Sequence, residues 1–277
     1  MNSKILLSFT VLGILLLASC ERVPFNPDLD TLNQEQLVVY GVLGNHPEYR
    51  TIELSRTAPY MDASEIETVE NASVSVSGPD HTYQFTHTQK GRYQAPAEFH
   101  AGTDTTYHLR IDIEGEIYEA SSTMRKPVNM HSLKVQPDRW EESDAGIYEV
   151  TGWVKDNPQE DEWFVFKYAV NEVLHDSIKV WSHYNDKLTN DQWLEDTMIF
   201  GNIDANEGDT IDVYGLSISK IYYDFIQAAE KNRISHNPFS PPGGVPVTGN
   251  ITNNALGIFQ ISAIVQERVM VPESTDS

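Results

Sequence analysis

The sequence has little cysteine, little positive charge and no long hydrophobic run. Its 277 residues include one cysteine, so no disulfide can form within the chain and the fold must be stabilised by a hydrophobic core. Lys and Arg number 19 against 41 Asp and Glu, which gives a formal net charge of -22 at pH 7. Nucleic acids and anionic lipids are bound by basic surfaces, so this charge balance argues against both as partners.

Recognisable catalytic motifs are also lacking. The sequence contains no metalloprotease HExxH, no GxSxG nucleophile elbow, no P-loop and no glycine-rich dinucleotide fingerprint. His81 and His87 would share a strand face with Tyr83 and Phe85 and could in principle hold a metal ion, but we interpret this face as a solvated or half-buried strand face near a loop. The run Asp204–Asp209 places its glycine one position too early for an EF-hand loop and is interpreted as an acidic turn. We therefore predict no cofactor and no metal ion.

The N-terminus carries a short apolar run that ends in the single cysteine. The run Ile5–Leu17 follows Lys4 and is shorter than the roughly 20 residues of a membrane-spanning helix, which favours a secretory leader. The tetrapeptide Leu17-Ala18-Ser19-Cys20 resembles the bacterial lipobox, in which the cysteine is lipidated and becomes the new N-terminus. We predict a signal peptide at 1–19 and a mature chain of 258 residues, with a formal side-chain charge of -23, anchored to the membrane by lipid on Cys20.

The rest of the chain has the pattern of an all-β protein. Residues 20–35 contain Pro24 and Pro27 and are predicted to be a tether between lipid and folded body. Short runs of β-forming residues then recur about every 8–12 residues, separated by Gly, Pro and Asp. The expected strands are Gln36–Leu43, Arg50–Ser55, Ala72–Ser77, Thr82–Thr86, Thr106–Ile113, Glu116–Ser121, Ile147–Lys155, Glu162–Val170, Ser177–Trp181, Thr210–Ser219 and Leu256–Val269.

We expect mainly antiparallel sheets in two domains, because the strand pattern pauses at Lys126-Pro127. Residues 36–126 would form an immunoglobulin-like or carboxypeptidase-regulatory-like sandwich. Residues 127–277 would form a second sandwich or barrel-like domain with one packed helix at 219–232. Ser219 is a candidate N-cap for that helix, and its apolar face is expected to be the one that carries Ile221, Phe225, Ala228 and Ala229.

All five tryptophans lie in the second half of the chain. Trp153 and Trp163 have apolar neighbours within predicted strands and are expected in the core. Trp140 and Trp193 lie in acidic, polar segments and are candidates for an exposed binding face, either for a glycan or for a peptide.

Several blocks of sequence together indicate a family. They are Cys20 with the short tether, Leu37-Val38-Val39-Tyr40-Gly41, Leu54-Ser55-Arg56-Thr57-Ala58-Pro59-Tyr60, Asn237-Pro238-Phe239-Ser240-Pro241-Pro242 and Leu256-Gly257-Ile258-Phe259. Their order resembles that of Bacteroidetes envelope lipoproteins that carry domain of unknown function 4249. The resemblance implies an envelope lipoprotein found alongside TonB-dependent outer-membrane receptors, and it supplies no activity and no catalytic residues.

Two of these blocks have the composition of loops, and loops on a rigid scaffold are where binding residues concentrate. We take Arg56 and Tyr60 from the first block, and Asn237 and Phe239 from the second, as candidate binding residues. The alternative is that both blocks are structural turns in which Pro and Asn fix the backbone.

The sequence leaves three classes of function open. The first is a non-enzymatic, lipid-anchored accessory protein of the outer membrane that acts with a TonB-dependent transporter. The second is a degradative enzyme such as a glycoside hydrolase, whose carboxylate pair would be hidden among the 41 acidic residues. The third is a structural subunit of a surface fibre.

Overall fold

The computed structural model describes residues 35–58, 66–141, 146–155, 161–185, 193–234 and 247–273. The predicted signal peptide, Cys20 and nearly all of the predicted tether lie outside the described residues. Within these ranges, the prediction of a mainly antiparallel all-β protein with one packed helix is confirmed.

Eight strands of the described chain form one sheet, in the order β15-β1-β2-β5-β4-β3-β6-β7. Apolar and polar residues alternate along most of these strands, so that one face of the sheet is buried; Val74 and Val76, for example, point into the core between exposed or half-buried serines. The strands are β1 Leu37–Gly44, β2 Thr51–Arg56, β3 Ser73–Ser77, β4 Thr82–Gln89, β5 Arg92–Gln94, β6 Thr105–Ile113, β7 Glu116–Met124 and β15 Leu256–Ser262.

The two end strands of this sheet come together, which makes it nearly closed and barrel-like. The Ile261 amide in β15 donates to Ser122 Oγ in β7 at 3.0 Å. Asn250 links the same strands, because its amide nitrogen donates to Ser121 O and Phe259 O while its oxygen accepts from the Phe259 amide. The enclosed core contains Tyr93, Phe99, Leu109 and Ile111 among its largest members.

The second half of the chain forms two smaller sheets. One has the order β11-β10-β14-β16 with β12 also paired to β10, and the other has the order β13-β9-β8. A separate apolar cluster around Val150, Phe166 and Val213 packs between them. The strands are β8 Asn129–Pro137, β9 Ile147–Lys155, β10 Trp163–Val170, β11 Val173–Leu174, β12 Ser182–Asn185, β13 Trp193–Asp204, β14 Thr210–Ser217 and β16 Ile264–Met270.

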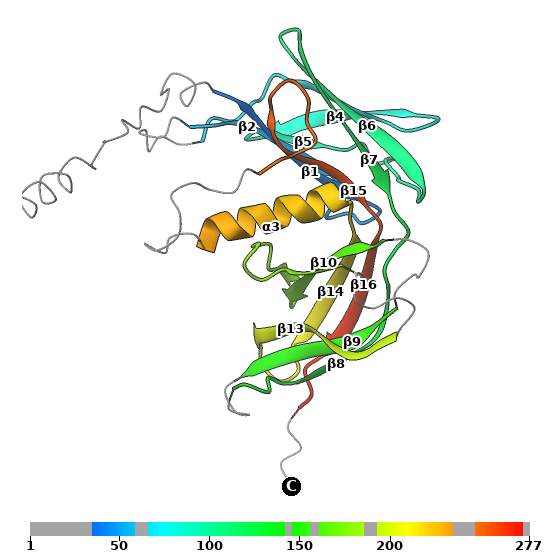
Figure 1. The fold of residues 1–277 in the computed structure, drawn as a ribbon, viewed down its shortest axis with the longest axis vertical. Helices are drawn as coiled ribbons and strands as arrows, with labels where there is room; N and C mark the ends of the chain where they lie inside the picture. The colour runs from blue at the N-terminus through cyan, green and yellow to red at the C-terminus, as the bar shows by residue number, and fades with distance from the viewer. Residues whose placement is uncertain are drawn as a thin grey trace, which may run out of the picture. The chain divides into compact units, whose positions relative to one another are not determined.

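The single closing strand predicted at Leu256–Val269 is wrong, because the segment divides at the buried Ala263. Its first part, β15, pairs in parallel with β1, and its second part, β16, pairs antiparallel with β14 (Figure 1). The C-terminal segment therefore adds a strand to the eight-stranded sheet before it joins the sheet formed by β10 and β14.

The predicted helix is present as α3, Lys220–Ile234. Ser219 caps it as expected, since its Oγ accepts from the Tyr222 amide at 3.3 Å. The predicted position of Ile221 on the buried face is wrong: Ile221 is 37% exposed, whereas Tyr222 and Ile226 are buried. Tyr222, the residue after Ile221, faces the core in its place. No helix in the described ranges is both long and apolar enough to cross a membrane.

Two long strands, β8 and β13, were not predicted, because neither keeps a regular period of two. β13 has three register shifts against β9, and β8 has one. A bulge moves the following side chains to the other face of the sheet, which removes the alternation that identifies a strand. The strand predicted at Ser177–Trp181 is wrong: residues 178–180 form a turn, and β12 begins at Ser182.

Gly257 tests the parallel pairing of β1 with β15. It has φ +101°, and an added Cβ would clash with the carbonyl group of Val39, its partner in β1. We expect Gly257→Ala to lower the free energy of unfolding by at least about 3 kcal/mol, measured by chemical denaturation. Gly115→Ala is the matched control, because Gly115 also has positive φ but has open space around it, so its cost should be only about 1–2 kcal/mol. Equal losses in the two variants would contradict the close contact.

Candidate functional site

The candidate site is a pocket of about 240 Å³ lined mainly by aromatic and branched apolar side chains. It lies where β1, α3 and the segment between β11 and β12 meet. The helix α3 also contacts β10 and β15, and Figure 1 shows it beside these two strands. Its walls are Tyr40, Asp176, Ile178, Trp181, Tyr222, Phe225 and Ile226.

A buried ammonium group supports one side of the pocket. Lys167 lies in the otherwise apolar strand β10 and is 2% exposed. Its Nζ donates to Asp176 Oδ1 at 2.7 Å and lies 3.9 Å from the centre of the Trp181 ring and 5.3 Å from that of Tyr49. Burial lowers the pKa of Lys167, and the carboxylate of Asp176 opposes that shift. This contact fixes two pocket residues, Asp176 and Trp181, against the sheet.

Three tyrosine hydroxyls lie close to Asp176. The hydroxyls of Tyr40 and Tyr222 are 3.4 Å apart, and the buried hydroxyl of Tyr49 has no hydrogen-bond partner among the described residues. Burial, reinforced by the charge of Asp176, raises the pKa of Tyr40 to about 12 and raises the pKa values of Tyr49 and Tyr222 as well. All three therefore stay protonated at neutral pH and are available as hydrogen-bond donors.

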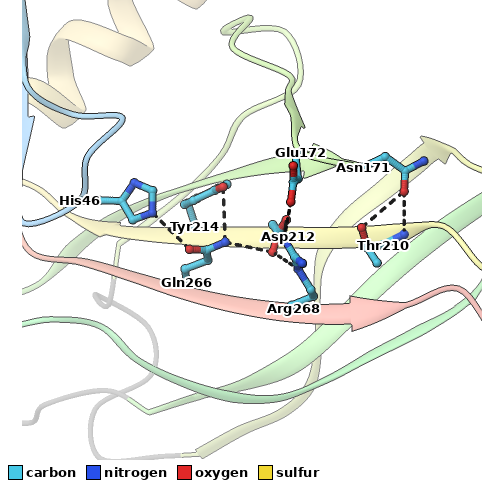
Figure 2. Close-up of polar contacts among 8 residues, drawn as sticks. All are labelled: His46, Asn171, Glu172, Thr210, Asp212, Tyr214, Gln266 and Arg268. Atoms are coloured by element: carbon cyan, nitrogen blue, oxygen red, sulfur yellow. Dashed lines mark hydrogen bonds and ion pairs between the residues drawn. The ribbon is translucent and has the colours of Figure 1, made fainter.

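The loop that carries Tyr49 is held by a row of polar contacts along β14 and β16 (Figure 2). Arg268 donates through Nε and Nη2 to both carboxylate oxygens of Asp212, at 2.7 and 2.8 Å. The Gln266 amide nitrogen donates to Asp212 Oδ1, and the Gln266 amide oxygen lies 3.2 Å from His46 Nε2. His46 in turn makes an edge-on contact with the Tyr49 ring. Asp212 thus connects the second sheet to the loop between β1 and β2.

Three buried carboxylates, those of Glu149, Asp212 and Asp138, have partners that serve the structure. Arg139 donates to both oxygens of Glu149, Arg268 does the same for Asp212, and Asp138 accepts from the backbone amides of Trp140 and Asn202. These hydrogen bonds lower the pKa values of all three acids. A glycosidase proton donor needs a raised pKa, so these carboxylates do not have the environment of a catalytic acid.

A metal-ligand cluster of three or more His, Cys, Asp or Glu side chains is not found in the described part of the chain. His87 lies in β4 and is half-buried, whereas His81 directly precedes that strand and is exposed, so the shared strand face predicted for the two histidines is wrong for His81. His81 stacks on Tyr83 and His87 contacts Tyr93, while Tyr83 and Phe85 are core residues.

The sequence-predicted site residues are not brought together by the described structure. Arg56 was expected in a loop but is the last residue of β2, where its backbone amide donates to Glu67 O and its side chain pairs with Glu67 at 3.8 Å. The composition of the Ser-Arg-Thr-Ala-Pro block hid this strand end, because the turn-forming Pro59 lies three residues later. Tyr60, Asn237, Phe239 and Cys20 lie outside the described residues.

Of the tryptophans, Trp140 is 81% exposed, which confirms its predicted exposure. Its backbone is fixed by the buried Asp138, but it lines none of the pocket walls. Trp163 is buried as expected, and Trp153 is half-buried. Trp193 begins β13, and its side chain is not described.

Sequence reasoning missed the residues that build the pocket. Lys167 offers the clearest signal, because a single charge in the run Trp163–Val170 must be buried with a partner if that strand is in the core. Asp176 and Trp181 could not be identified as its partners, since they lie on either side of a turn whose path is set by tertiary contacts. Tyr40 and Tyr222 read as ordinary core residues.

The ion pair of Asp212 and Arg268 gives a stability prediction. We expect Arg268→Met to lower the free energy of unfolding at pH 7 by about 2 kcal/mol, because it leaves a buried carboxylate with only the Gln266 amide as donor. The wild-type pKa of Asp212 is depressed, so its stabilising contribution is present above the ordinary Asp pKa of 3.8 and is lost as the pH falls below it. Denaturation from pH 7 to pH 3 should show a smaller acid loss in the variant.

Arg110→Met is the matched control for this pair. Arg110 forms an ion pair of 3.1 Å with Glu119, but both side chains are about half exposed. Its removal should change the free energy of unfolding by less than about 1 kcal/mol. An Arg268→Met variant as stable as this control would show that Asp212 does not depend on Arg268.

Comparison with known proteins adds one match. The family model described as Domain of unknown function (DUF4249) matches residues 22–268, which include every pocket residue and all of the described strands except the last two residues of β16. A search of the curated proteins finds no match to the chain. The match extends over most of the sequence and confirms the domain to which the sequence blocks pointed. The chain belongs to the family defined by this domain of unknown function.

Proposed function

We propose that the protein is a non-enzymatic binding protein of the bacterial cell envelope, anchored to the outer membrane by lipid on Cys20. In this proposal it acts beside a TonB-dependent transporter, and its body presents a ligand-binding pocket close to the membrane. Retention is supplied by the lipid and recognition by the folded body.

The lipid anchor is supported by the sequence at residues 1–20. A short apolar run ends in Leu17-Ala18-Ser19-Cys20, and this cysteine is the only one in the chain. The strongly acidic composition supports the same arrangement, because a body with this charge is repelled by anionic lipid and needs a covalent anchor to stay at a membrane.

The binding role is carried by one observation, the aromatic pocket next to Lys167. Its polar groups are suited to holding a ligand: protonated tyrosine hydroxyls, and a carboxylate already bonded to an ammonium group. A pocket with apolar walls and a few converging polar groups is the usual form of a small-molecule site.

The anchor is tested by metabolic labelling with a fatty acid in the native host. The wild-type chain should incorporate labelled palmitate and fractionate with the outer membrane. Cys20→Ala should lose the label entirely and leave the outer-membrane fraction, because no other thiol is present to accept lipid. Ser19→Ala, which keeps a small residue before the cysteine, is the matched control and should label normally.

The partnership is tested by affinity purification of the wild-type chain from detergent-solubilised membranes. Recovery of a TonB-dependent receptor in stoichiometric amount is expected. An unlabelled wild-type protein contradicts the anchor, and purification without any outer-membrane receptor contradicts the partnership.

A further inference from the structure

We infer that the pocket lined by Tyr40, Asp176 and Trp181 binds a neutral hydroxylated ring, that is, a single sugar residue. This inference rests on the proposed binding function and specifies its ligand.

The tyrosine hydroxyls of the pocket can donate a hydrogen bond to an oxygen atom of a ligand. Tyr40 and Tyr222 together have two hydroxyl protons, and their mutual contact of 3.4 Å can use only one of them. Both residues border the pocket. The second proton has no acceptor among the described residues. A ligand hydroxyl placed beside the two tyrosines would accept it.

The same site offers an acceptor. Asp176 has a half-exposed side chain, and only its Oδ1 is bonded to Lys167. Its Oδ2 is left to accept from a ligand at the pocket wall. A ligand that uses both groups must therefore accept one hydrogen bond and donate another within the same pocket, as a ring with several hydroxyl groups can.

The charges around the pocket favour a neutral ligand. Lys167 and Asp176 form a pair with no net charge, and Glu53, the partner of Tyr40 in β2, is itself paired with Arg92 at 3.1 Å. A carboxylate or phosphate would meet Asp176, whereas an organic cation would lie close to the buried ammonium of Lys167. Neither an anionic nor a cationic ligand would find, in the pocket wall, a group of opposite charge that lacks an ion-pair partner.

The walls and the size favour a ring. Trp181 and Phe225 supply aromatic surface, and Ile178 and Ile226 supply aliphatic surface. The volume of about 240 Å³ is below the range of about 300–1,000 Å³ typical of drug-sized ligands, so the part of a ligand held inside the pocket is about one ring. The apolar C–H face of a pyranose against an aromatic ring, with hydroxyls at its edge, satisfies both kinds of wall.

The test is calorimetric titration of the full-length protein in a polyoxyethylene detergent, whose head group carries no sugar. The probes are the methyl glycosides of glucose, galactose, mannose and N-acetylglucosamine, with phenol, tetramethylammonium and acetate as the competing chemical classes. We expect saturable binding of at least one methyl glycoside, and no binding of the two ions. A free hexose compared with a disaccharide ending in the same residue then separates a free sugar from the end of a glycan as the source.

Tyr40→Phe removes one hydroxyl and should weaken glycoside binding about tenfold. Tyr148→Phe is the matched control, because Tyr148 is buried in β9 within a different apolar cluster, and it should leave binding unchanged. Phe225→Leu provides a second test if Tyr40→Phe fails to fold, because it removes aromatic wall surface without touching the pair of Lys167 and Asp176, and it should also weaken binding about tenfold.

Binding of phenol without any glycoside would overturn the inference, as would the absence of binding by all probes or equal affinities in Tyr40→Phe and Tyr148→Phe. A protein that is lipidated and recovered with its receptor, but binds no glycoside, would lose this inference and keep its proposed place in the envelope.

Discussion

The candidate site depends on one interaction, the ion pair between the buried ammonium group of Lys167 and the carboxylate of Asp176. A charged side chain that is 2% exposed is costly unless it is paired and hydrogen-bonded. Here the cost is offset by the Asp176 carboxylate and by the rings of Trp181 and Tyr49. Each of these partners comes from a different part of the chain than β10, so the pairing of one lysine determines where a turn and a loop are placed.

The second constraint is the path of the C-terminal segment. Because β15 pairs with β1 and β16 pairs with β14, the strand that carries Tyr40 and the sheet that carries Lys167 are connected through a single buried residue, Ala263. The side chain of Asn45 reinforces this connection, since it bonds to both backbone groups of Ile264. The pocket is thereby assembled from residues more than 180 positions apart in the sequence, such as Tyr40 and Tyr222.

Much of the fold could be predicted from the sequence, because most strands are short runs of β-forming residues separated by Gly, Pro and Asp. The strand β9 was predicted with its exact bounds, and α3 was predicted from its N-cap Ser219 and its apolar spacing. The errors occur where tertiary pairing differs from what the local sequence pattern indicates. The strand β13 was missed because its bulges interrupt the alternation. The change of sheet at Ala263 was missed because the β-forming residues continue without a break from β15 into β16.

The candidate site could not be predicted in the same way. Its residues are tyrosines, a tryptophan and isoleucines, which are core residues by composition, and their roles follow only from which of them meet Lys167 and Asp176. A lone lysine in an apolar strand is the one local signal, and it indicates a buried partner without saying which residue that is. The exposed Trp140 gave a stronger sequence signal and yet lies outside the pocket.

The most direct measurement is amide hydrogen exchange in wild type and Lys167→Met. Methionine keeps the apolar packing on Trp181 and Tyr49 but removes the bond to Asp176, so the sheets should stay folded. The account predicts that the amides of residues 175–181 exchange faster in the variant, while those of β10 and β14 keep their protection. Unchanged exchange across residues 175–181 would contradict the claim that the buried lysine holds the pocket together.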